Sequence, residues 1–154
     1  MILRAKFHRK ILFGTILTAV LAVSGQTNAT SEFGSYLAGR HAQTLKDSAK
    51  ASAFMLRVLE ENPGDQKLLR RTFLLTLAAG NFEVAVPLAK RIEESGGKMS
   101  TASLLLGIEA ARNSDFESAR KQFDALPRRG LSAYASPLAS AWSSAGVGDY
   151  DAAL

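Results

Sequence analysis

The sequence predicts an all-α protein built from stacked helix-turn-helix repeats. A short pattern recurs as "KDSAKA", "GNFEVA", "SDFESA" and "GDYDAA", beginning at residues 46, 80, 114 and 148. The four starts are 34 residues apart, and recurrence at such a period is typical of repeat architectures. Residues that break helices gather near the end of each unit, in "ENPGD" (61–65), "SGGKM" (95–99) and "LPRRG" (126–130). These breaks separate segments with few Gly or Pro, which favours helices between them.

We align the four units in a frame of 34 positions, and the residue types at these positions predict two helices in each unit. Its units begin at Glu32, Gln66, Ser100 and Tyr134. Frame position 16 holds an Asp or Asn, which is typical of a helix N-cap; these residues are Asp47, Asn81, Asp115 and Asp149. Position 20 is always Ala, and position 8 is small in all units except the second, where it is Phe73. Small residues at both positions favour a close crossing of two antiparallel helices, so the packing around Phe73 stays open.

These features resemble the tetratricopeptide repeat (TPR) family, whose unit is a 34-residue helix-turn-helix. The resemblance covers about residues 32–154 and rests on the following elements: Tyr36–Gly39, Ala51, Pro63, "GNFEVA", Gly107 with "SDFESA", and "GDYDAA". It implies a right-handed superhelical solenoid of about three and a half units, at residues 32–65, 66–99, 100–133 and, incomplete, 134–154. The segments "SYLAGRHA" and "LLRRTFLLTLAAGNF" are also similar to the start of longer secreted bacterial TPR proteins.

The last repeat stops at Leu154, early in its predicted second helix. Repeat arrays usually close with a capping helix that has a polar outer face. We therefore expect either the N-terminal part of a longer protein or an uncapped apolar edge, through which self-association is possible.

The first 29 residues predict a cleaved secretory signal peptide, which leaves residues 30–154 as the repeat domain. A basic start, "MILRAKFHRK", precedes 13 apolar residues from Ile11 to Val23, and Thr27 and Ala29 stand before the expected cut. This order of regions is typical of export signals. The alternative is an uncleaved anchor helix, but spanning a bilayer takes about 20 residues. We expect an exported protein, periplasmic or secreted if the source is bacterial, that meets a membrane only transiently.

The net charge of +5 arises mostly from this leader. Four of the 19 Lys and Arg residues lie in the first ten positions, and all 14 acidic residues lie after residue 30. Beyond residue 29 there are 15 basic and 14 acidic residues, which leaves a net charge of +1. The charge therefore gives no reason to expect a nucleic-acid partner. The chain has no Cys, so no disulfide framework is expected.

No catalytic constellation is present, and we expect neither an enzyme nor a cofactor or metal site. The sequence contains no metalloprotease, dinucleotide-binding, phosphate-loop or nucleophile-elbow motif. His41 is the one His beyond the leader, and we expect it on a solvent-facing helix surface. The adjacent pairs Glu60–Glu61 and Glu93–Glu94 point about 100° apart on a helix, so they do not form carboxylate pairs.

The resemblance implies a binding surface along the first helix of each unit. In this family, frame positions 2, 5, 9, 12 and 13 line a concave groove. The predicted partner-binding residues are Tyr36, Arg40, Lys67, Arg70, Leu74, Ile108, Arg112 and Trp142, with Leu104 and Leu138 beside them. They form a basic end near Arg40, Lys67 and Arg70 and an apolar end around Trp142. The alternative is that these positions are solvated or pack between helices, and Trp142 could face a later helix.

We therefore predict a protein-interaction module, an adaptor or assembly scaffold of the cell envelope that binds a protein or peptide segment in the groove. The partner segment is expected to be acidic near the basic end. One alternative is the N-terminal targeting arm of a larger enzyme whose catalytic domain lies beyond Leu154. Another is a structural spacer, for which changes in the groove would be silent. The Lys, Asn and Arg set with which some family members hold a C-terminal carboxylate is not met.

Overall fold

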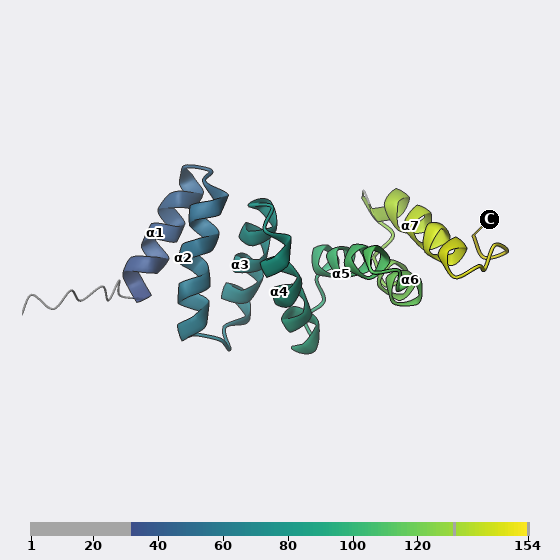
Figure 1. The fold of residues 1–154 in the computed structure, drawn as a ribbon. Helices are drawn as coiled ribbons and strands as arrows, with labels where there is room; N and C mark the ends of the chain where they lie inside the picture. The colour runs from purple at the N-terminus through teal and green to yellow at the C-terminus, as the bar shows by residue number, and fades with distance from the viewer. Residues whose placement is uncertain (1–31, 131, 154) are drawn as a thin grey trace, which may run out of the picture. The chain divides into compact units, whose positions relative to one another are not determined.

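The computed structural model describes residues 32–130 and 132–153; the predicted signal peptide lies outside them. These residues form seven helices and no strand (Figure 1). The helices are α1 (Glu32–Thr44), α2 (Ser48–Glu61), α3 (Gln66–Ala78), α4 (Phe82–Glu94), α5 (Ser100–Arg112), α6 (Phe116–Asp124) and α7 (Ser132–Gly146). The predicted fold class, an all-α repeat solenoid, is confirmed. None of the helices in the described residues is long and apolar enough to cross a membrane.

The turn that follows the first helix of each unit has the same backbone geometry in all four units. Frame position 15 adopts a positive φ at Lys46 (59°), Gly80 (74°), Ser114 (62°) and Gly148 (82°). In the second unit Gly80 N donates to Leu77 O at 3.0 Å and Asn81 N donates to Thr76 O at 3.1 Å. Equivalent pairs of bonds occur in the other three units. This pattern is a Schellman motif, which satisfies the last carbonyl groups of the first helix.

The residue after this turn caps the second helix, as position 16 of the frame predicts. Asp47 Oδ1 accepts from Lys50 N at 3.0 Å, Asn81 Oδ1 from Val84 N at 3.3 Å and Asp115 Oδ1 from Ser118 N at 3.1 Å. These bonds satisfy amide groups that the first helical turn leaves without a partner. In the fourth unit Asp149 Oδ1 accepts from Ala152 N at 3.2 Å, although residues 151–153 form a turn and not a helix.

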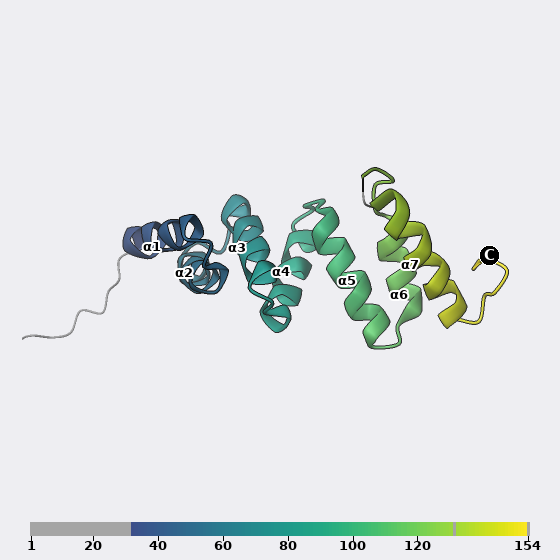
Figure 2. The ribbon, with the colours of Figure 1, turned by 90° about the horizontal axis from the view of Figure 1, so that it is seen from above.

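Each helix packs against the next one along the chain (Figures 1 and 2). One core runs through α2, α3, α4 and α5 and includes Met55, Leu69, Phe73, Ile92 and Leu106. A smaller core, with Ala119, Phe123 and Leu126, joins α6 to α5 and α7. The amphipathic faces of neighbouring helices therefore cover one another, and burial of apolar area stabilises the stack.

The frame locates the starts of α1, α3 and α5 at Glu32, Gln66 and Ser100. The helix α7 begins at Ser132, two residues before Tyr134, the first residue of the fourth frame unit. The loop before it carries Pro127 and Gly130, and Gly130 O accepts from Ala133 N at 3.2 Å. The first turn of α7 therefore starts directly after this loop.

Close contact between the two helices of a unit takes two forms. In the first and third units a glycine of the first helix faces a large side chain. A Cβ atom on Gly39 would lie 2.9 Å from Met55 Cε, and one on Gly107 would lie 2.5 Å from Phe123 Cε1. In the second unit the large residue is Phe73, fully buried on the first helix, and the residue at the position of Met55 and Phe123 is Ala89, also fully buried.

Candidate protein-binding surface

The predicted partner-binding residues lie on the first helices of the units, α1, α3, α5 and α7. Frame position 9 is occupied by Arg40, Leu74, Ile108 and Trp142, and all four are exposed. The three apolar side chains in this row are 45%, 53% and 61% exposed. On α7, Leu138 stands one turn before Trp142 and is 73% exposed. The repeat thus places apolar side chains in solvent on three successive first helices.

Trp142 packs edge-on against the helix before it. Its ring centroid lies 5.5 Å from that of Phe116 in α6, with 84° between the ring planes. Phe116 also lies close to Gly146, where a Cβ atom would be 2.5 Å from Phe116 Cγ. Edge-to-face geometry is a favoured arrangement of two aromatic rings. Phe116 therefore holds one side of the Trp142 ring and leaves most of it exposed.

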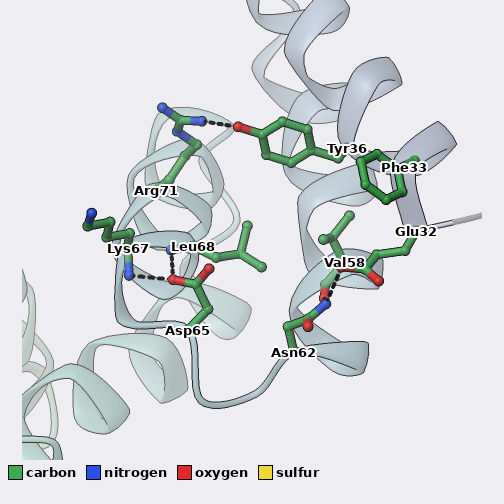
Figure 3. A pocket seen from close by; sticks show the side chains of 9 residues that line it. All are labelled: Glu32, Phe33, Tyr36, Val58, Asn62, Asp65, Lys67, Leu68 and Arg71. Carbon is green, nitrogen blue, oxygen red and sulfur yellow. Dashed lines mark hydrogen bonds between the residues drawn. The ribbon is translucent and has the colours of Figure 1, made fainter.

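At the other end of the stack, a cavity of about 440 Å³ lies between α1, the end of α2 and the start of α3 (Figure 3). We call it the α1–α3 pocket. Its lining residues are Glu32, Phe33, Tyr36, Val58, Asn62, Asp65, Lys67, Leu68 and Arg71. The pocket brings together Tyr36 and Lys67, both predicted from the sequence.

Arg71 and Tyr36 form one end of the pocket (Figure 3). Arg71 Nη1 donates to Tyr36 Oη at 3.1 Å and so links α3 to α1. Side-chain hydrogen bonds from Arg40 and Arg71 hold the pKa of the Tyr36 phenol below its ordinary value of 10.0, because both donors favour the phenolate. Among the described residues, no ion pair is formed by Arg40, Lys67 or Arg71. This end of the pocket is therefore positive.

The other end of the pocket carries two carboxylates. Asp65 caps α3, and its Oδ1 accepts from Lys67 N at 2.8 Å and from Leu68 N at 3.0 Å. Glu32 Oε1 accepts from Asn62 Nδ2 at 2.6 Å, which joins the start of α1 to the end of α2. Figure 3 shows both carboxylates on the side of the pocket away from the Tyr36 hydroxyl. The pocket is therefore positive at one end and negative at the other.

Arg70 and Arg112 do not take part in this pocket. The Arg70 guanidinium lies beside the turn after α4, where a Cβ atom on Gly97 would be 3.0 Å from Arg70 Nη2. Arg112 Nη2 forms an ion pair with Glu109 Oε1 at 2.9 Å within α5. The structure therefore separates Arg70 from Lys67, although the sequence placed them in one basic group. His41 is exposed on α1, where the sequence placed it.

Sequence analysis missed two residues of the pocket, Phe33 and Arg71. Phe33 occupies frame position 2, one of the groove positions, yet it was not selected. Arg71 occupies position 6, which is not among them. Position 6 is apolar in the other units, where it is Leu37, Leu105 and Ala139. A cation in an otherwise apolar column was the signal that could have identified Arg71.

The described fold belongs to the class of TPR-like helical repeats. Solved structures named MamA AMB-1 and MamA MSR-1 are similar to it, with TM-scores of 0.64 and 0.61. Their sequences are 19% and 18% identical to this chain; each match covers 83% of this chain and 70% or 74% of the other. No protein-family model and no curated protein matches the chain. At these identities the likeness establishes the fold.

Proposed function

We propose that this chain is a non-enzymatic protein-interaction module that binds a partner segment along its first helices. The observation that carries the proposal is the exposed apolar row Leu74, Ile108 and Trp142, one residue per repeat. Exposed large apolar side chains often mark interaction sites, and Trp is enriched among interface anchors. Leu104, one turn before Ile108 on α5, is partly exposed. The repeat spacing suits an extended segment that crosses successive helices.

The experiment is selection of binding peptides from a displayed random library on the folded wild-type chain. Selected peptides are then measured against Ile108→Asp and Trp142→Ala. We expect both variants to weaken binding at least tenfold, because each removes an exposed anchor whose loss costs about 2 kcal/mol or more. Phe82→Asp is the matched control, since Phe82 is 55% exposed but begins a second helix. Equal loss in the control, or binding that survives both changes, contradicts the proposal and favours a structural spacer.

We further propose that the module is exported and acts as an adaptor or assembly scaffold of the cell envelope. The support is the order of basic, apolar and small-residue segments before residue 30. The intact mass of the protein recovered from its own cells tests this. A mass lower by the first 29 residues is expected. An unprocessed N-terminus contradicts it.

The second candidate is the targeting arm of a larger enzyme. A mass well above 16.5 kDa for the native protein, together with a downstream domain of different composition, would favour this candidate. Further 34-residue units downstream would favour the scaffold.

A further inference from the structure

The positive end of the α1–α3 pocket holds cations that the described residues leave without a carboxylate. Lys67 and Arg71, both on α3, line the pocket and form no ion pair with a described carboxylate. Arg40, on α1, is not a lining residue, but its guanidinium lies near the Tyr36 hydroxyl. Arg71 donates one N–H to the Tyr36 hydroxyl, and a guanidinium carries five N–H donors in a fixed fork. Donors therefore remain at this end of the pocket for an incoming acceptor.

The Tyr36 ring fixes the place where an acceptor would bind. Its hydroxyl is held by Arg71 across the gap between α1 and α3, so the guanidinium plane is positioned before any ligand arrives. A side chain whose rotamer is already fixed loses less conformational entropy on binding. A carboxylate matches this geometry because it accepts two parallel N–H bonds from one guanidinium.

Beside the positive end lies an apolar wall. Val58 and Leu68 are buried at the base of the pocket, and the Phe33 ring stands over it with 79% of its surface exposed. Figure 3 shows Phe33 and Val58 on one side of the pocket and Leu68, on α3, on the other. An apolar side chain placed here would cover the exposed ring. The two carboxylates Glu32 and Asp65 repel a second acid at the far end, so an acidic ligand group binds in one orientation.

We propose that the α1–α3 pocket binds an acidic side chain of a partner peptide, with a neighbouring apolar side chain against Phe33 and Leu68. The proposal rests on the function proposed above and adds the chemistry of one subsite. A pocket of about 440 Å³ accommodates side chains and not a folded partner. The acid supplies a carboxylate partner for Arg71 and Lys67, which form no ion pair among the described residues. The apolar neighbour supplies the burial that Phe33 lacks.

The test uses short fluorescent peptides that are acetylated and amidated, so that neither end carries a charge. Their central pair is Glu-Leu, Gln-Leu, Lys-Leu or Glu-Ser, and fluorescence anisotropy measures the dissociation constant. We expect the Glu-Leu peptide to bind about tenfold tighter than Gln-Leu, because a hydrogen bond to a charged group contributes about 1.5–3 kcal/mol. The preference should shrink at high salt, since the site is open to solvent.

Arg71→Gln should bring the Glu-Leu and Gln-Leu peptides to equal affinity. Arg70→Gln is the matched control, because Arg70 is the preceding residue but lies beside Gly97 outside the pocket. Tyr36→Phe keeps the ring but removes the hydroxyl, and should reduce the Glu preference about threefold to fivefold. Phe33→Ser should remove the preference for Leu over Ser, while Leu37→Ser, an exposed residue on the same helix, should not. Thermal melts check that each variant remains folded.

Three results would overturn the proposal: equal binding of all peptides to the wild type, an equal loss in Arg70→Gln, or binding only of peptides with a free C-terminal carboxylate. Inhibition by acetate as effective as by the peptide would show a simple anion site and overturn it as well. Failure here is distinguishable from failure of the proposed function. If library peptides bind Trp142→Ala more weakly but show no acidic preference, the proposed interaction function is supported and the α1–α3 pocket proposal is contradicted.

Discussion

The second repeat carries its large contact residue on the first helix, whereas the first and third repeats carry theirs on the second helix. In those two, a glycine at frame position 8 lets a large side chain at position 24 approach the first helix. In the second, the large side chain is Phe73 at position 8, and the residue at position 24 is Ala89. Both of these are fully buried. The large side chain is therefore on the other helix, although the same two frame positions, 8 and 24, are involved.

In these three repeats one large and one small residue occupy the two positions, and either helix can carry the large one. Protein interiors are packed as densely as organic crystals, so a change of volume on one side must be compensated on the other. A glycine at position 8 is therefore needed only where position 24 is large. The comparison makes direct predictions, because each half of the pair can be changed alone or together.

The largest expected effect is that of Phe73→Ala. The fully buried ring leaves a cavity facing Ala89, and we expect the free energy of unfolding to fall by about 3–5 kcal/mol. Adding Ala89→Met to this variant restores the arrangement of the first repeat and should recover part of the loss. Urea unfolding measures both. A double variant less stable than Phe73→Ala alone would show that the volume is not exchangeable between the two positions.

A smaller loss of stability is expected when Gly107 or Gly39 is replaced by Ala, and the two losses should differ. Gly107→Ala places a Cβ atom 2.5 Å from a ring carbon of Phe123, and we expect a loss of about 1–3 kcal/mol from overpacking. Gly39→Ala should cost less, because its nearest neighbour is the terminal methyl of Met55 at 2.9 Å, which is flexible. Thermal unfolding of the two variants, compared side by side, tests this ranking. Equal losses would mean that the flexibility of Met55 does not matter.

Among the described residues, the second repeat carries the one buried side-chain hydroxyl that has no hydrogen-bond partner. Thr72 Oγ1 is buried and has no hydrogen-bond partner among the described residues. Thr76 Oγ1, one turn later, donates to Thr72 O at 2.8 Å. We expect Thr72→Val to raise the free energy of unfolding by about 1 kcal/mol, because it removes a polar group that loses its water on folding. Thr76→Val is the control, and it should not stabilise. A less stable Thr72→Val would contradict this account.

The fold was predictable because the repeat signal is local and redundant. Asp47, Asn81 and Asp115 are N-caps that mark the start of a second helix. An N-cap can be predicted from sequence because it bonds only to the next turn of the chain. The repeat frame does not fix the start of α7, because that start depends on where the loop with Pro127 and Gly130 ends. The sequence also left the packing of Phe73 open, because its compensation by Ala89 lies sixteen residues away on the other helix.

The candidate surface was only partly predictable. Leu74, Ile108 and Trp142 share one frame position and are exposed on α3, α5 and α7. The frame positions did not locate the α1–α3 pocket, whose walls come from three helices and whose key contact joins Tyr36 to Arg71. Arg70 and Arg71 are adjacent in sequence, yet the Arg71 side chain lines the pocket and the Arg70 guanidinium lies beside Gly97. Side-chain direction about a helix, and not charge alone, decides which cation belongs to the pocket.

The smallest effect that we predict concerns the turns, where the repeats differ in residue but not in backbone. Gly80 and Ser114 both adopt a positive φ, of 74° and 62°. An L-residue pays steric strain in this conformation that glycine avoids, although glycine gives the unfolded chain more freedom. We expect Ser114→Gly to gain about 0.5–1 kcal/mol and Gly80→Ala to lose about 1 kcal/mol. Chemical unfolding measures both changes. The opposite signs carry the test: if both substitutions destabilise, the third repeat holds Ser114 by contacts of its own, and the shared turn geometry is not what selects glycine.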